Sequence, residues 1–596
     1  MPKLSSRFST LLLLNALPVL AAGPRVEFRL TDQPGRWYQA STPAIAGSQS
    51  IAVSTPGVEV DFGGASHTVH TMTSLLFPTG AANMPFDTKP MKGSAHVVLT
   101  TPGLYVFVCK IHPYMLGAVI VDDPATPGLD LGESITLVTG VTVPTSSDLA
   151  TRLLRLFFIA TNPANCQDYR STAPWHITYP DVNVRITGGA VVNLAAVLSA
   201  RYGNDLTLEH PHNPATPGVG EVWVDTQFET TAGKQTPGTA TAIDATSWLP
   251  RRKVSLPQIE MNNPHNMWTD RSQTLIYQTQ WFDSKLTVFD RLTGRLLDNI
   301  MVGEAPAHVM TRVDTDQLHV TIEGTSDTQS VVELAPGAKG IERHVDIGRG
   351  NPHAHWMSHD GKVMVTPNAF TADSTIYDFA TGSVRDIVHT GTHPIATAMS
   401  PDSSKYYVAN FLENTISVIQ TSTGQVMKTI NLIANYNPVS GAVTGPVGGL
   451  PIQTPVSPNG RYMVTANLLT ETITITDAAS DTLIKSLPCD PGCHGVQIGA
   501  KKGGGYYAYV SNKFSNTMLV VDGDPNNDGD PSDAAVVGRI LMTSAPGTAS
   551  DDRIIGNFGM GGQGVLAVPI VYNGWVQNLP QSFKNLLTPG QLHPIP

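Results

Sequence analysis

Residues 109–115, which read CKIHPYM, hold three side chains of the kinds that bind metal ions. Cys109, His112 and Met115 follow the spacing C-x2-H-x2-M, and an apolar run leads straight into the cysteine. A loop of this kind at the end of a strand would present a thiolate, an imidazole and a thioether to one point. His67 would add a second imidazole from another strand. These four ligands suit copper, because the sulfurs favour Cu(I) and imidazole tolerates both oxidation states.

The same pattern has a simpler alternative interpretation. Cys109 could be a buried structural thiol, with His112 at the surface. Met72, Met84 and Met91 fit core or surface positions better than ligand positions.

The segment around this loop has the pattern of a small β-sandwich. From residue 25 to residue 123, short apolar runs such as VEVDF, AHVVLTT and AVIVDD are separated by Gly and Pro. With the C-x2-H-x2-M loop and the upstream segment H-x-V-H, this domain of about a hundred residues resembles the cupredoxins, and amicyanins in particular. The resemblance implies a blue, type 1 copper site with the ligands His67, Cys109, His112 and Met115. It leaves His70 outside the ligand set.

The C-terminal part of the chain, residues 220–580, repeats with a period of about 40–45 residues, as propellers and solenoids do. Each unit predicts a four-stranded blade. Two pieces of one further unit lie at opposite ends of this region, so the last strand would complete the first blade and close the ring. We therefore predict an all-β fold, a cupredoxin β-sandwich followed by a seven-bladed β-propeller. The units resemble the YVTN-type repeats of bacterial propellers.

Five histidines recur at the same place in successive units, just before the innermost strand: His265, His308, His353, His393 and His494. Side chains at this place would converge on one mouth of the central channel, where imidazoles could bind Cu, Zn or Fe. Any one of them alone could equally be a turn or surface residue. Gln453 and Gln563 take the same place in the two remaining units.

Parts of the repeats, among them NPHAHWMSHDGK and YVSNKFSN, look like the propeller of the nitrous oxide reductases. Thiocyanate dehydrogenases have a similar histidine-lined copper hub. The resemblance implies a second, multinuclear copper centre held by the five histidines, with Lys513 as a catalytic cation beside the substrate. It adds His210, His212 and His355 as further ligand candidates. Nitrous oxide reductases carry a dinuclear copper domain after the propeller, whereas this chain has a mononuclear site before it, so we expect a different reaction.

Composition limits the remaining function classes. Only 14% of the 596 residues are charged, and the net charge of −11 includes no basic run of the kind that nucleic acids require. Residues 1–21 have the basic start, apolar run and small residues of a signal peptide, so we expect a periplasmic or secreted protein without a membrane span. Residues 124–219 are expected to connect the two domains. Within them, residues 147–166 predict a short helix or a buried strand.

Two short motifs have more than one interpretation. Cys489 and Cys493 lie close enough to form a disulfide, and together with His494 they also resemble a lengthened haem attachment motif. Residues 524–530 carry acidic and amide side chains at alternating positions, as calcium loops do, although a solvated acidic turn fits equally well. Calcium is therefore a further candidate ligand.

Together these patterns favour an exported, copper-dependent oxidoreductase. A small substrate would react at the histidine hub, because a type 1 site has no open position, and the sandwich would exchange electrons with a small cytochrome or cupredoxin. The alternative is a non-enzymatic, copper-binding electron carrier whose propeller is a docking platform. A hydrolytic propeller of the lactonase type would need Ca²⁺ held by Asp, Glu and Asn, and the in-register histidines argue against it.

Overall fold

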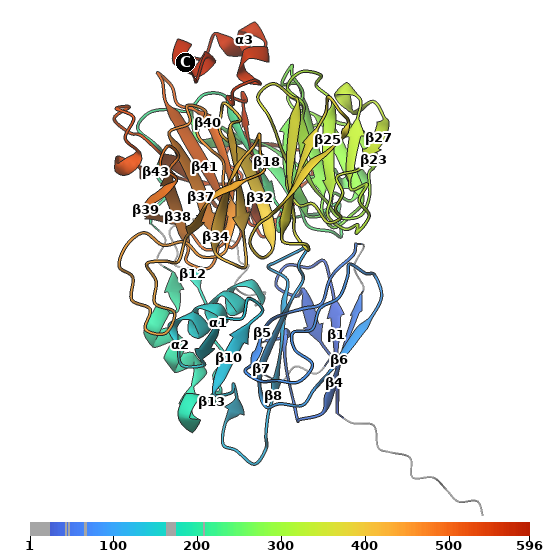
Figure 1. Ribbon diagram of the computed structural model, residues 1–596, viewed down its shortest axis with the longest axis vertical. Coiled ribbons are helices and arrows are strands. Elements are labelled where there is room, and N and C mark those ends of the chain that lie inside the picture. Colours follow the sequence, from blue (N-terminus) through green and yellow to red (C-terminus); the bar gives the residue numbers. More distant parts are fainter. Residues whose placement is uncertain are drawn as a thin grey trace, which may run out of the picture.

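The computed structural model describes residues 24–41, 45, 48–64, 68–161, 175–206 and 209–595. The expected signal peptide, His67 and Cys166 lie outside this part of the chain. The N-terminal third forms a lower layer, in blue and teal, and the remainder forms sheets above it (Figure 1). Most of the secondary structure is β-strand, as predicted. No helix among the described residues is both long and apolar enough to cross a membrane.

The lower layer contains a β-sandwich of two sheets. Buried and exposed side chains alternate along its first strand, as expected where only one face of a strand meets the core. The first sheet has the strand order β2 (Tyr38–Ala40), β1 (Arg25–Leu30), β4 (Val58–Gly64) and β6 (Ala95–Leu99). The second sheet has the order β11 (Thr142–Pro144), β10 (Ser134–Leu137), β5 (Thr73–Pro78), β7 (Gly103–Val108), β8 (Leu116–Val121) and β3 (Ile51–Ser54).

Strands β10 and β11 continue the second sheet beyond residue 123, into the segment that the sequence assigned to the connecting region. β10 pairs antiparallel with β5, with Ile135 opposite Pro78, and β11 pairs with β10. Without them β5 would be an edge strand with unpaired backbone groups, which explains why the chain adds them.

The connecting region packs beside the sandwich and contacts the propeller. Its helix α1 (Asp148–Thr161) decides between the two predictions for this segment in favour of a helix. Arg155 of this helix forms an ion pair of 2.7 Å with Glu471 of the propeller. The other elements are β9 (Leu129–Asp130), β12 (Trp175–His176), β13 (Asn183–Ile186), η2 (Thr187–Gly189), β14 (Ala190–Asn193), α2 (Leu194–Tyr202) and β15 (Asp205–Leu206).

Seven sheets of the described residues form the upper ring. The first blade contains β46 (Gly562–Val568), β16 (Glu221–Thr226), β18 (Thr239–Asp244) and β19 (Leu249–Val254), with β44 (Ala549–Ser550) outside them. The second blade contains β20 (Pro264–Thr269), β21 (Leu275–Gln280), β22 (Lys285–Asp290) and β23 (Leu296–Met301). The third contains β24 (Pro306–Thr311), β25 (Leu318–Ile322), β26 (Val331–Leu334) and β27 (Ile341–Val345). The fourth contains β28 (Trp356–Met357), β29 (Val363–Asn368), β30 (Asp373–Asp378) and β31 (Ser383–His389). The fifth contains β32 (Pro394–Met399), β33 (Lys405–Asn410), β34 (Thr415–Gln420) and β35 (Val426–Asn431). The sixth contains β36 (Pro451–Gln453), β37 (Tyr462–Asn467), β38 (Thr472–Asp477) and β39 (Thr482–Pro488). The seventh contains β40 (Cys493–Ala500), β41 (Tyr506–Asn512), β42 (Thr517–Asp522) and β43 (Ala535–Leu541). Shorter elements at the blade edges are β17 (Thr230–Thr231), paired with β45 (Ile554–Gly556), and the turns η3 (Pro257–Ile259), η4 (Pro336–Ala338) and η5 (Pro531–Asp533).

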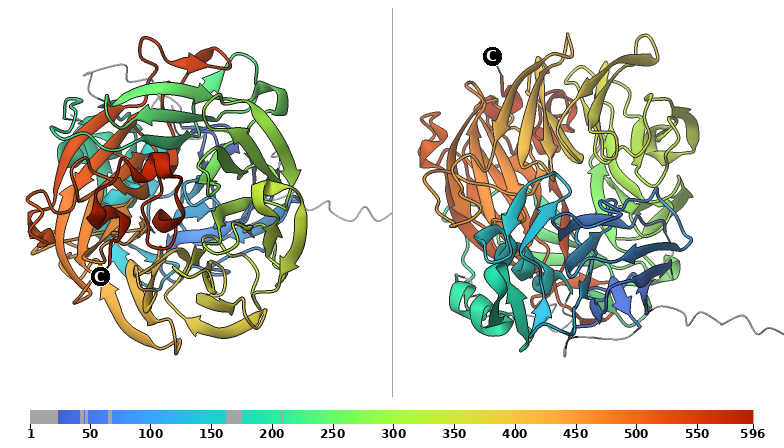
Figure 2. Two further views of the ribbon diagram at one scale, coloured as in Figure 1. Left: turned by 90° about the horizontal axis from the view of Figure 1, so that it is seen from above. Right: turned by 60° about the horizontal axis from the view of Figure 1, so that its bottom comes forward.

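The ring closes as the split repeat predicts. The C-terminal strand β46 pairs antiparallel with β16, with Leu566 opposite Trp223, and so completes the first blade from the inside. Seen from above, the sheets surround a central axis (Figure 2).

The two mouths of the channel are covered by different parts of the chain. The segment after β46, with η6 (Val576–Asn578), α3 (Gln581–Lys584) and α4 (Pro589–Leu592), crosses the face opposite the sandwich (Figure 2). Trp575 of this segment packs on Trp268 and Trp356 of the ring, at centroid distances of 5.7 and 6.3 Å.

The sandwich covers the other mouth. Trp37 of the sandwich lies 5.7 Å from Phe228 and 5.9 Å from Phe282 of the propeller, measured between ring centroids. All three rings belong to one buried apolar cluster that spans both domains. The sandwich and the propeller therefore share a core at the mouth where the in-register histidines lie.

Candidate metal centres

The loop after β7 folds back on itself through its own backbone. The amide of Met115 donates to the carbonyl of His112 at 2.8 Å, and the amide of Cys109 donates to the carbonyl of Met115 at 3.2 Å. The amide of Thr71, on a neighbouring segment, donates to Cys109 Sγ at 3.3 Å. These bonds fix the cysteine sulfur, and Met115 is buried in the same loop.

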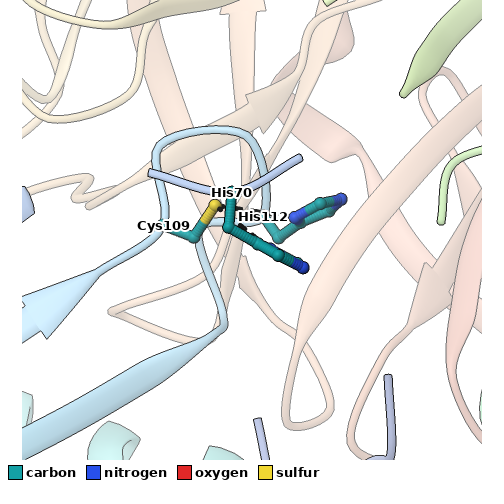
Figure 3. Close-up of side chains that lie close together, drawn as sticks. All are labelled: His70, Cys109 and His112. Carbon is teal, nitrogen blue, oxygen red and sulfur yellow. Dashed lines mark hydrogen bonds between the residues drawn. The ribbon is translucent and has the colours of Figure 1, made fainter. Parts of the chain in front are cut away.

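Two imidazoles approach this sulfur. Cys109 Sγ lies 3.6 Å from Nδ1 of His112 and 3.8 Å from Nδ1 of His70 (Figure 3). Metal–ligand bonds of about 2.0–2.3 Å separate neighbouring ligand atoms by about 3.3–3.8 Å, so these three atoms have the spacing that one bound ion requires. The group is one of two among the described residues that could hold a metal ion.

Burial sets the protonation of this first group. Burial lowers the pKa of His70 to about 3 and that of His112 well below its usual value. Burial also raises the pKa of the Cys109 thiol to about 11, although hydrogen bonds from Thr71 oppose the rise. Both imidazoles are therefore neutral, which is the form that binds metals, while the thiol must lose its proton to become a ligand.

Among the described residues, the upstream histidine at this site is His70, which the resemblance to the cupredoxins leaves outside the ligand set. An antiparallel bridge positions it, since its amide and carbonyl pair with the carbonyl and amide of Met91 at 3.0 and 2.9 Å. His67, the predicted ligand, lies outside the described residues. The segment H-x-V-H offers two histidines three residues apart, and the backbone pairing of His70 with Met91 has no recognisable sequence signal.

The second group lies at the propeller mouth that faces the sandwich. His265, His308 and His353 come from three successive blades, and their ring centroids are 5.0–5.3 Å apart. One nitrogen of each lies within 4.8 Å of the others, so the structure brings three of the five in-register histidines into one candidate metal site.

Neighbouring groups orient two of these imidazoles. Nδ1 of His265 lies 2.9 Å from the carbonyl oxygen of Ala307, and Nδ1 of His353 lies 2.9 Å from Oε2 of Glu323. Such contacts on one ring nitrogen leave the other nitrogen free for a metal ion. Burial lowers the pKa of His353 to about 3 and raises that of Glu323 well above its usual value. Sequence reasoning missed Glu323, because this residue follows β25 and lies outside the repeated histidine position.

The remaining hub histidines lie close to this group without joining it. Burial, with further contributions from Lys513, His353 and His308, lowers the pKa of His494 well below its usual value. His393 is buried, with Nδ1 3.1 Å from the carbonyl oxygen of Ala369.

Of the further candidates, one lies near the hub and two do not. His355 is buried and lines one cavity with His308 and Gln453, whose side-chain nitrogens are 3.5 Å apart. His210 and His212 are exposed, and His212 pairs through its backbone with Arg539 on the outer strand β43. They lie on the outside of the ring because their segment runs along an outer strand rather than into the channel.

Lys513 is completely buried where the propeller meets Tyr114 of the sandwich. Its side-chain nitrogen donates to the side-chain oxygens of Gln227 and Gln563 and lies 3.7 Å from the ring centroid of Tyr114, in the loop after β7. Burial lowers the pKa of Lys513 well below its usual value, and Asp225 opposes this shift. Lys513 thus lies near His494 of the hub and is held by amide oxygens, and burial disfavours its charged form.

The structure decides the first of the two ambiguous motifs. Cys489 and Cys493 form a disulfide, which leaves neither thiol for haem attachment. In the acidic turn, the Asp524 carboxylate accepts from the amide of Gly529 at 3.0 Å, and Asn526 donates to Asp528 at 3.0 Å. These carboxylates are not among the described groups that could hold a metal ion.

Comparisons with known proteins reach only the fold. No family model and no curated protein matches the sequence. Among solved structures, hydrazine synthase from Kuenenia stuttgartiensis matches with a TM-score of 0.41 and 17% identity, over 52% of this chain and 97% of that chain. A functionally unknown protein from Desulfotomaculum acetoxidans matches with a TM-score of 0.40 and 14% identity, over 57% of this chain and 99% of that chain. Likenesses this distant say nothing about the chemistry of the site, which depends on the geometry above.

Proposed function

We propose that this chain is an exported copper redox protein with two copper sites. His70, Cys109 and His112, with Met115 from the same loop, would hold a type 1 copper that exchanges single electrons. His265, His308 and His353 would hold a second copper centre, at which a small substrate is oxidised or reduced. The external electron partner would be a small cytochrome or cupredoxin.

The observation that carries this proposal is the spacing around Cys109 Sγ. One thiolate and two imidazole nitrogens at 3.6 and 3.8 Å suit copper that changes oxidation state, and the amide of Thr71 bonded to the sulfur is a contact that tunes the potential of such sites. Burial supports the same assignment, because a site closed to solvent suits electron transfer better than substrate binding.

The hub has a cavity with a polar lining beside one of its histidines. His308 is only partly buried, and it lines a cavity that also contains His355, Gln453 and Gln497. A small molecule in this cavity would lie beside a hub ligand. We therefore place the substrate reaction at the hub and electron storage at Cys109.

The test is copper content and optical spectrum on protein produced in the periplasm with copper, for wild type and two variants. We expect more than one copper per wild-type chain. Cys109→Ala should lose the blue absorption but retain hub copper, and His265→Ala/His308→Ala should retain the blue absorption but bind less copper.

His212→Ala is the matched control, because this exposed histidine is distant from both groups, and it should match wild type. A single copper that disappears with Cys109→Ala would contradict the proposal of a second copper centre. It would favour the electron carrier, with the propeller as a docking platform.

A further inference from the structure

Trp281 separates the two candidate metal groups. It directly follows β21 and is almost completely buried, and its amide donates to the carbonyl of Asn263 at 3.4 Å. On the sandwich side, the centroid of its ring lies 4.5 Å from that of His112, in an edge-to-face arrangement. The indole therefore touches a ligand of the Cys109 site.

On the hub side the same indole contacts two ligands. Its ring centroid lies 4.0 Å from that of His265 and 5.8 Å from that of His353. Its Nε1 donates to Oε2 of Glu323 at 3.2 Å, and this oxygen lies 2.9 Å from Nδ1 of His353. Direct ring contact and a polar chain thus join Trp281 to the hub.

Other neighbours touch only one group. Phe282 stacks on His112 at 4.1 Å and lies 6.0 Å from His70, both measured between ring centroids. Among the described aromatic side chains, Trp281 is the only one with ring contacts to ligands of both groups. A second route could run from Lys110 towards His393, but His393 is not part of the three-histidine group.

We propose that Trp281 is the electron relay between the Cys109 site and the histidine hub, an inference that rests on the proposed function. The rate of electron tunnelling falls steeply across an empty gap and is higher through closely packed atoms. The indole of Trp281 provides such packing between His112 and His265. One electron leaves the metal in one group as one electron arrives in the other. Trp281 mediates this transfer without itself being oxidised, so no bond changes and no proton moves. The substrate and the external partner supply and remove the electrons.

The test is the rate of electron transfer inside the copper-loaded chain. After a one-electron reducing pulse, relaxation of the blue absorption reports transfer between the sites in either direction. For Trp281→Leu we expect transfer to slow at least severalfold, because the smaller side chain opens a gap between His112 and His265. Copper content and the blue spectrum should not change. Trp281→Met provides a second non-aromatic variant should Trp281→Leu fail to fold, and Trp281→Phe should retain most of the wild-type rate.

Phe282→Leu is the matched control, because it removes a ring from His112 without touching the hub, and it should slow transfer much less. A copper-replete Trp281→Leu chain with the wild-type rate would overturn the relay alone. Loss of copper from both non-aromatic variants would indicate a structural role and would also overturn the relay. A wild-type chain without a second copper would overturn the proposed function and, with it, this inference.

Discussion

At the scale of single residues, the Cys109 site depends on which histidine completes it. The structure places Nδ1 of His70 3.8 Å from the sulfur, while Thr71, the next residue, donates its amide to the same sulfur. One short segment therefore contributes both an imidazole and a hydrogen bond. A shift of this segment would therefore move the His70 imidazole and the Thr71 amide together relative to the sulfur.

Substituting each of the two upstream histidines tests which of them binds copper. The structure indicates His70, and the resemblance to the cupredoxins implies His67. We predict that His70→Ala loses nearly all of the blue absorption and about one copper ion per chain, because it removes one of three strong ligands. His67→Ala, the matched substitution three residues away, should retain both. Copper analysis and optical spectroscopy of the two purified variants measure this. The reverse outcome would restore His67 as the ligand.

The buried thiol predicts a pH dependence of copper binding. Because the pKa of Cys109 is about 11 without metal, binding must release one proton at neutral pH. Apparent Cu(I) affinity should therefore rise about tenfold per pH unit from about pH 6 to about pH 9. The histidines add nothing to this slope, because burial keeps the pKa of His70 at about 3 and that of His112 lower than usual.

The measurement is competition with a chelator whose own protonation is known. The competition is carried out on the His265→Ala/His308→Ala variant, so that the measured affinity is that of the Cys109 site alone. Cys109→Ser should lose the slope together with most of the affinity. A pH-independent affinity would mean that the thiol is already ionised before copper binds.

The residue types at this site were predictable, and the choice between neighbours was not. Because Cys109 and His112 share one short loop, their separation along the sequence is enough to predict that they lie close together. His70 reaches the sulfur only because its segment bridges to Met91. Glu323 and Trp281 were missed for the same reason, since their roles arise from contacts between blades and between domains.

At the scale of elements, closure of the ring depends on one strand. All seven residues of β46 are buried, and they pair with β16 on the inner side of the first blade. The repeats predicted this closure because each blade is a local unit with its own turns and strands. They did not predict that β10 and β11 would extend the sandwich, because these short strands belong to a sheet formed by distant residues.

Truncation tests the closing strand. A chain that ends at Met560 should fail to fold as a soluble monomer, because the first blade would lose its inner strand and expose an open edge. A chain that ends at Pro580 keeps β46 and loses α3 and α4, and it should fold with a melting temperature only a few degrees lower. Expression yield, gel filtration and thermal unfolding compare them. A folded monomer from the shorter chain would contradict the role assigned to β46.

At the scale of the whole molecule, both ends of the channel are covered by the chain itself. The sandwich packs on one mouth through a shared apolar cluster, and the segment around Trp575 covers the other. This arrangement places the Cys109 site directly against the histidine hub. The order of domains along the chain does not predict this contact, which forms through rings such as Trp37, Phe228 and Phe282.

The most direct test of two adjacent copper sites is anomalous X-ray scattering at the copper edge from crystals of the copper-loaded chain. We predict one peak among His70 Nδ1, Cys109 Sγ and His112 Nδ1, and a second among the imidazoles of His265, His308 and His353, with Trp281 between them. Crystals with the first peak and no copper among the three hub histidines would contradict the two-site proposal.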